Sequence, residues 1–404
     1  MLRPISMRTF CLLAVATVMS GISAIAAGQD LPPRIRVGVI MSMTGGAAPS
    51  AAAAPIPALK MAFKEIDEKG GIAGRPVDWV WADDGSDPTQ AVNETRRLLD
   101  RERVNVVIGP NISTLAFAAL PVLTQAKIAS IHVAGSSSFT PQVAPYGFSS
   151  TYNPGKYAQT MVDYAVDVLK AKSIAILSAN GAADKAVVED FKKAIASRGI
   201  ALTGEQAHEF RASDVTPQLL ALRRGNPDVV LSQESVGEDG ALVIKTMNEI
   251  GWKVRVLSNV SALLSASYLK VGGPDIYKDD RTYGLIFRNY TACKGAPVGQ
   301  SEFARFLQSV KRFDPEVYGK LSIYTISIQY DGVMLLKAAI EGTRSVNGQV
   351  LANWIEQNAS KLPAVTGKMQ ASTDNHILFS GDALTFVARP DIKRADDLLS
   401  RPDC

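Results

Sequence analysis

The stretch RIRVGVIMSM, residues 34–43, carries the clearest strand signal in the chain. It is mostly apolar and rich in β-branched residues, as a strand buried on both faces of a parallel sheet has to be. Gly45-Gly46 ends the strand, and the next segment places its apolar residues on one helical face before Gly70-Gly71 stops it. A strand followed by a helix is the repeating unit of an α/β protein.

The same unit recurs along the rest of the chain. Further strands are expected at 77–82, 104–108, 128–134, 173–177, 229–232 and 254–257, with helices between them. This alternation with short turns predicts mainly parallel sheets flanked by helices. Because 404 residues exceed the size at which one core usually stops growing, we expect two lobes. Near the C-terminus, 376–388 has the pattern of a β-hairpin around Gly381-Asp382.

The composition is that of an ordinary globular protein and excludes several function classes. Apolar residues make up 47% and charged residues 20%, and the net charge of +4 is spread without a basic stripe, so nucleic acid is not an expected partner. His132, His208 and His376 lie in unrelated segments, and no H-E-x-x-H, G-x-S-x-G or P-loop motif is present. We therefore expect no enzyme activity, not even that of an exported hydrolase, and no cofactor or metal site.

The N-terminus has the form of a signal peptide. Arg3 and Arg8 supply positive charge, an apolar run covers 10–19, and Ala24-Ile25-Ala26 matches an A-x-A cleavage site. The apolar run is too short to span a bilayer comfortably. This pattern predicts that residues 1–26 are removed on export and that the mature protein acts in the periplasm.

Two cysteines remain after that cleavage, Cys293 and Cys404. In an oxidising compartment an even pair is a disulfide candidate, which here would pin the C-terminal tail. Two unpaired thiols are the alternative, and the spacing does not decide between them.

Candidate binding residues follow two neighbouring strands. In an open α/β sheet, ligands bind beyond the carboxyl ends of the strands. Ser113 and Thr114 open a helix there, where free backbone N–H groups and hydroxyls suit a carboxylate. Gly135 and Ser136 follow the next strand and allow close approach to the backbone. Capping of its own helix is the alternative role for Ser113, and a polar surface turn is the alternative for 135–138.

Six segments, taken in order, resemble one known family. They are 36–45 (RVGVIMSMTG), 69–76 (KGGIAGRP), 83–88 (DDGSDP), 106–110 (VVIGP) with Ser113, 226–230 (NPDVV) and 330–332 (YDG). The chain is similar to the leucine/isoleucine/valine-binding (branched-chain amino acid) family of type I periplasmic solute-binding proteins of ABC importers, and the resemblance covers nearly all of the mature chain.

The resemblance implies two α/β lobes, joined by three hinge crossovers, that clamp a ligand between them. We expect the crossovers near Thr151, Leu285 and Thr366. Lobe 1 would then contain 34–151 and 286–365, and lobe 2 would contain 152–285 and 366–404.

The resemblance also implies a set of ligand contacts. On lobe 1 the carboxylate would meet the residues at the two strand ends, and the late helix would add a side-chain wall; these residues are Ser113, Thr114, Ala134, Gly135, Ser136 and Tyr324. On lobe 2, positions that carry tyrosines or an acid in the family fall at Asn180, Ser235 and Asn259. Glu234, also at a strand end, is the candidate partner for a ligand ammonium.

The function that follows is capture of a small carboxylate ligand and its delivery, by a monomer, to the membrane permease of an ABC importer. An amino acid of branched-chain type is the ligand that the family implies. An aromatic or other organic acid is the alternative, because the expected wall residues on lobe 2 are small. A sensor subunit that signals to a membrane kinase is the alternative from another functional class.

Overall fold

The computed structural model describes residues 31–45, 48, 55–209, 212–234, 237–259, 271–273, 276–277, 280–318, 323–389, 392–401 and 404. The predicted signal peptide, 1–26, lies outside these residues. Within the described ranges, no helix is long and apolar enough to cross a membrane.

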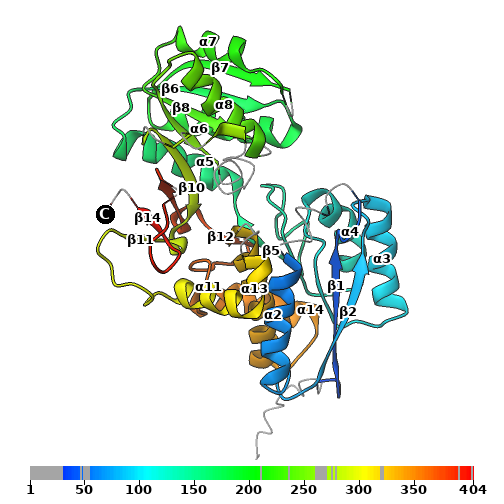
Figure 1. Ribbon diagram of the computed structural model, residues 1–404. Coiled ribbons are helices and arrows are strands. Elements are labelled where there is room, and N and C mark those ends of the chain that lie inside the picture. The colour runs from blue at the N-terminus through cyan, green and yellow to red at the C-terminus, as the bar shows by residue number, and fades with distance from the viewer. Residues whose placement is uncertain are drawn as a thin grey trace, which may run out of the picture.

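The first sheet is entirely parallel, in the order β12-β5-β4-β3-β1-β2 (Figure 1). Its strands are β1 (Ile35–Met41), β2 (Val77–Asp83), β3 (Val106–Ile108), β4 (Ser130–His132), β5 (Gly147–Tyr152) and β12 (Ile377–Phe379). The helices around it are α2 (Pro55–Glu68), α3 (Pro88–Asp100), α4 (Ser113–Gln125), α13 (Ile323–Thr343) and α14 (Gly348–Asn358).

Side-chain alternation along β1 explains why helices cover both faces of this sheet. Val37 and Val39 share a buried cluster with apolar residues of α2 and α13, whereas Ile40 packs with residues of α3 and α4. Successive residues of a strand point to opposite faces, so a strand that is apolar at nearly every position needs cover on both. His132, at the end of β4, is buried in the core, with its Nε2 2.8 Å from Ser130 Oγ.

The second sheet has the order β13-β10-β9-β8-β6-β7, and only the β13–β10 pair is antiparallel. Its strands are β6 (Ser173–Ala179), β7 (Ala201–His208), β8 (Val229–Gln233), β9 (Arg255–Ser258), β10 (Thr282–Phe287) and β13 (Leu384–Val387). Its helices include α5 (Pro154–Asp163), α6 (Ala182–Ser197), α7 (Thr216–Arg223) and α8 (Gly237–Glu249). A π-helical turn, η1 (Tyr164–Val168), extends α5, and α11 (Glu302–Phe313) and α12 (Pro315–Tyr318) precede α13.

The chain passes between the two sheets after β5, after β10 and between β12 and β13. The hairpin predicted at 376–388 is wrong, because β12 pairs in parallel with β5 of the first sheet and β13 pairs with β10 of the second. The third crossover between the lobes therefore lies at 380–383 and not near Thr366, where it was predicted. Residues 366–379 accordingly belong to the lobe of the first sheet. The hairpin was predicted because β12 has only three residues and is followed directly by Ser380-Gly381, a pattern that is also typical of the first strand of a hairpin.

A small third sheet holds the C-terminal tail. β11 (Thr291–Cys293) pairs in parallel with β14 (Leu399–Arg401). Cys293 and Cys404 form a disulfide beside it, with the sulfurs 2.08 Å apart, so the alternative of two free thiols does not apply to this structure. Arg394 reinforces the attachment, since its guanidinium donates to the carbonyl oxygens of Cys293 and Ala296 at 2.8 and 2.7 Å.

Candidate functional site

A cavity of about 560 Å³ lies where the carboxyl ends of strands from both sheets meet. The first sheet contributes the start of α4 and the segments after β4 and β5, and the second contributes the start of α6 and the ends of β8 and β9. The lining residues are Ser113, Thr114, Phe117, Gly135, Ser136, Ser137, Thr151, Tyr152, Pro154, Tyr157, Asp184, Ala186, Val187, Asp190, Gln233, Glu234 and Asn259. Six residues predicted from the sequence are therefore brought together: Ser113, Thr114, Gly135, Ser136, Glu234 and Asn259.

The wall from the first sheet is rich in hydrogen-bond donors. Helix α4 begins at Ser113, and its N-cap residue, Ile112, is extended (φ −127°, ψ 133°) and makes no side-chain cap hydrogen bond. The first N–H groups of an α-helix have no intrahelical partner, and they carry the positive end of the helix dipole. The alternative role for Ser113 as its own helix cap is wrong, because Ile112 occupies that position. This wall suits a carboxylate.

Ala134 does not line the cavity. It is fully buried, its N–H donates to Ser149 Oγ at 2.9 Å, and its carbonyl oxygen accepts from the same hydroxyl at 3.1 Å. The predicted ligand contact of Ala134 is therefore wrong. Its two hydrogen bonds to Ser149 instead hold the backbone in place just before Gly135 and Ser136.

The wall from the second sheet is rich in acceptors. Asp184 lies in the first turn of α6 and Asp190 in the third, and the Nε2 group of Gln233 donates to Asp184 Oδ1 at 3.0 Å. Tyr157 in turn donates its hydroxyl hydrogen to Gln233 Oε1. Asn259 is 4% exposed and donates from Nδ2 to the Glu234 carbonyl oxygen at 2.7 Å. Its Oδ1 has no hydrogen-bond partner among the described residues.

The carboxylate of Glu234 is engaged within the protein and is not positioned to meet a ligand ammonium. Its Oε2 lies 2.8 Å from His208 Nε2, its Oε1 accepts from Ser232 Oγ at 2.9 Å, and its side chain is 0% exposed. Burial alone would lower the pKa of His208, but the hydrogen bond and charge of Glu234 outweigh it and raise that pKa to about 9. At neutral pH one proton therefore lies between His208 Nε2 and Glu234 Oε2.

The remaining predicted residues lie elsewhere or outside the described side chains. Asn180 follows β6, where its N–H donates to the His208 carbonyl oxygen at 2.9 Å, and it does not line the cavity. Ser235 lies outside the described residues, as does the side chain of Tyr324, although α13 includes Tyr324.

The sequence reasoning missed the acceptors and the aromatic wall. The acceptors are Asp184, Asp190 and Gln233, and the aromatic residues are Phe117, Tyr152 and Tyr157. One signal was available for the first of these: Asp184 stands in the first turn of the helix that follows a strand, as Ser113 does. No comparable signal marks Gln233, which is the last residue of an otherwise ordinary buried strand.

Comparison with known proteins identifies the family of this chain. A family model described as periplasmic binding protein matches residues 34–387. The chain belongs to the periplasmic binding protein family. An amino acid binding protein from Pseudomonas aeruginosa is 26% identical over 313 residues, which are 76% of this chain and 78% of that protein.

Two solved transporter binding proteins share the fold. One is the branched-chain amino acid transporter substrate binding protein LivJ from Streptococcus pneumoniae in complex with isoleucine (TM-score 0.70, 17% identity, 88% of this chain and 95% of that one). The other is an ABC transporter solute binding protein from Rhodopseudomonas palustris in complex with 3,4-dihydroxybenzoic acid (TM-score 0.70, 20% identity, 92% and 96%). The expected two-lobed type I fold with mainly parallel sheets is confirmed.

Proposed function

We propose that this periplasmic binding protein captures an amino acid in its zwitterionic form and delivers it to the permease of an ABC importer. The observation that carries the proposal is the opposition of the two walls. Donors at the start of α4 and at 135–137 face acceptors at Asp184, Asp190 and Asn259 across one cavity. An amino acid carries a carboxylate for the first wall and an ammonium for the second.

The charge of the cavity favours a zwitterion over a simple acid. Among the described residues, no lysine, arginine or histidine lines the cavity, whereas Asp184 and Asp190 do. Glu234 adds no net charge because it is paired with His208, and Asp190 lies 3.3 Å from Lys193, which is outside the lining. The carboxylate of Asp184 would repel a ligand that carried only a carboxylate. The Oδ1 atom of Asn259 adds to the argument, since a buried acceptor left without a donor costs about 1–3 kcal/mol. An ammonium N–H would remove that cost.

The side chain of the ligand would lie among the apolar residues of the cavity, which include Phe117, Tyr152 and Val187. An amino acid as the ligand is supported by the name of the Pseudomonas aeruginosa relative and by the isoleucine bound to the Streptococcus pneumoniae protein. The second candidate is an aromatic acid, which the aromatic wall and the 3,4-dihydroxybenzoic acid complex favour.

A thermal-shift screen of the purified mature protein separates these candidates. The screen includes the twenty amino acids, 3,4-dihydroxybenzoate and benzoate. We expect stabilisation by at least one amino acid, and loss of that shift in Asp184→Asn, which keeps the shape and removes the charge. The control is Asp163→Asn, a carboxylate on the same lobe outside the cavity. Stabilisation by the aromatic acids alone, undiminished in Asp184→Asn, would favour the second candidate.

We further propose that residues 1–26 direct export to the periplasm and are removed there, and that the protein acts as a monomer by binding alone. The A-x-A pattern at 24–26 supports the cleavage position. Mass spectrometry of the periplasmic protein should show a mature N-terminus at Ala27 or within two residues of it. An intact Met1 on a membrane-held protein would contradict this. Co-purification with a membrane kinase in place of a permease would support the sensor role instead.

A further inference from the structure

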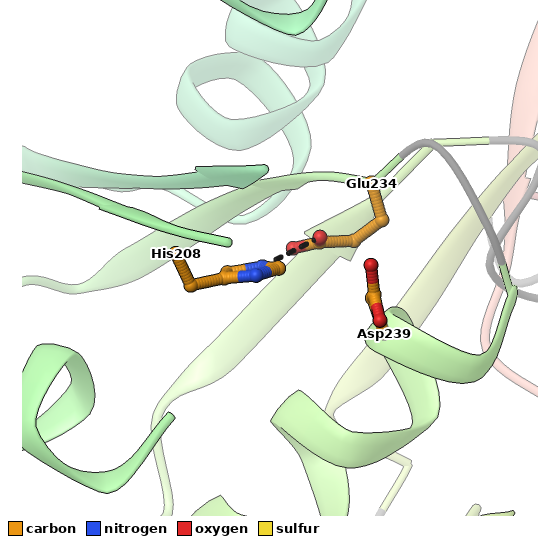
Figure 2. A group of neighbouring side chains, drawn as sticks. All are labelled: His208, Glu234 and Asp239. Carbon is orange, nitrogen blue, oxygen red and sulfur yellow. Dashed lines mark hydrogen bonds and ion pairs between the residues drawn. The ribbon is translucent and has the colours of Figure 1, made fainter. Parts of the chain in front are cut away.

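A second cluster of ionisable side chains lies on the second lobe, behind the ligand cavity. His208 at the end of β7, Glu234 after β8 and Asp239 in the first turn of α8 converge, and their ligand atoms all lie within 4.8 Å of one another (Figure 2). All three are buried, with 3%, 0% and 2% of their surfaces exposed. No other group of three such residues occurs in the described part of the chain.

The surroundings of His208 orient it as a metal ligand would be oriented. Its Nδ1 lies 2.8 Å from the Glu209 carbonyl oxygen, which can only accept, so Nδ1 carries a proton and Nε2 faces Glu234. Ser232 donates to the other carboxylate oxygen of Glu234 at 2.9 Å. In metal sites, outer hydrogen bonds of this kind, to the far nitrogen of a histidine and to a carboxylate, hold the metal-binding residues in place.

The spacing of the three ligand atoms also suits a single metal ion. The 2.8 Å between His208 Nε2 and Glu234 Oε2 is close to the roughly 3.3 Å between adjacent ligands of a tetrahedral Zn²⁺ ion. No two of the three ligand atoms, the third being a carboxylate oxygen of Asp239, are more than 4.8 Å apart.

We propose that His208, Glu234 and Asp239 bind one divalent first-row transition metal ion. One imidazole nitrogen and two carboxylate oxygens suit Zn²⁺ and similar ions, and leave positions open for water. Ca²⁺ and Mg²⁺ fit poorly, because they take sets of oxygen ligands. The site lies directly behind the ligand cavity, since the carbonyl oxygen of Glu234 accepts from Asn259 and Glu234 itself lines the cavity.

Titration calorimetry of the full mature chain with ZnCl₂ tests the proposal, with no affinity tag and after treatment with a chelator. We expect one Zn²⁺ per chain at pH 8, with release of about one proton per ion, measured by repeating the titration in buffers of different ionisation enthalpy. Asp239→Asn should weaken binding at least tenfold while the His208–Glu234 pair stays in place. The matched control is His376→Gln, which removes a second histidine–carboxylate pair, between buried His376 and partly buried Glu356 at 3.0 Å, and should leave Zn²⁺ binding unchanged.

Zinc-edge X-ray absorption on the wild-type protein gives a measurement that does not depend on a variant folding. We expect one imidazole and otherwise oxygen ligands. The proposal would be overturned if the wild-type protein failed to bind one Zn²⁺ per chain, or if its absorption spectrum showed sulfur or several imidazoles bound to the metal. It would also be overturned if Asp239→Asn bound Zn²⁺ at full strength, or if His376→Gln lost as much affinity as Asp239→Asn. None of these results bears on the ligand cavity, which is tested separately above.

Discussion

Replacement of Ser113 by proline gives a direct way to separate the hydroxyl from the backbone N–H at the start of α4. Ser113 is the first helical residue, a position where proline is well tolerated because the missing N–H has no intrahelical partner. The residue before a proline must be extended, and Ile112 already is, with φ −127° and ψ 133°. Ser113→Pro should therefore leave the helix intact and remove two donors from the cavity wall.

The size of the effect follows from the number of donors lost. A hydrogen bond to a charged group contributes about 1.5–3 kcal/mol, which is roughly ten- to a hundredfold in affinity. Ser113→Ala removes the hydroxyl and should weaken binding of the amino acid by about that factor. Ser113→Pro also removes the N–H and should weaken it by at least another tenfold.

Calorimetry on both variants, with the amino acid that stabilises the wild-type protein most, measures these factors. Thermal denaturation checks that the two variants unfold within a few degrees of the wild type. Equal, wild-type affinity in Ser113→Ala and Ser113→Pro would refute the assignment of the ligand carboxylate to this helix start. Equal weakening in both would show that the hydroxyl alone makes the contact.

Three further predictions concern stability. The Cys293–Cys404 disulfide closes a loop with a sequence separation of 111, so its reduction should lower the free energy of unfolding, measured by urea denaturation, by about 5 kcal/mol. An unchanged denaturation midpoint, or two free thiols in the unfolded, unreduced protein, would contradict this. The pKa of His208 is raised to about 9, so its contribution to the free energy of unfolding is fully present below pH 6.5 and is lost as pH rises through 9. In metal-free buffer the free energy of unfolding should fall by on the order of 3 kcal/mol over that window, and in His208→Gln it should not fall in this way. Gly71→Ala should destabilise the protein by about 1–3 kcal/mol, because Gly71 has φ +85° and a Cβ there would lie 1.9 Å from the Arg75 carbonyl oxygen; a melting temperature equal to that of the wild type would count against it.

The part of the site that follows from strand ends could be predicted from the sequence. Ser113, Thr114, Gly135 and Ser136 line the cavity because each follows a strand whose carboxyl end faces the other lobe, and that rule needs only the strand–helix alternation. Ala134 obeys the same rule but is turned into the core by Ser149, a contact between strands that the sequence does not reveal.

The part that depends on strand order could not be predicted. Glu234 was expected to meet the ligand, but His208 reaches its carboxylate across the end of β6, because β6 lies between β7 and β8. That neighbourhood exists only once the sheet order β8-β6-β7 is known. The same applies to β12, whose three residues join the first sheet although the next strand, β13, belongs to the second. Short strands carry too few residues for their pattern to specify a partner.

The most direct test of the account compares one amino acid with its two truncated analogues on the wild-type protein. The amino acid is the one that stabilises the protein most, and the analogues lack either its ammonium or its carboxylate. Because donors and acceptors occupy opposite walls, each analogue loses contacts with one wall, and calorimetry should show each to bind at least tenfold more weakly than the parent. An analogue without the ammonium that binds as tightly as the parent amino acid would contradict the claim that the cavity holds a zwitterion between the two lobes.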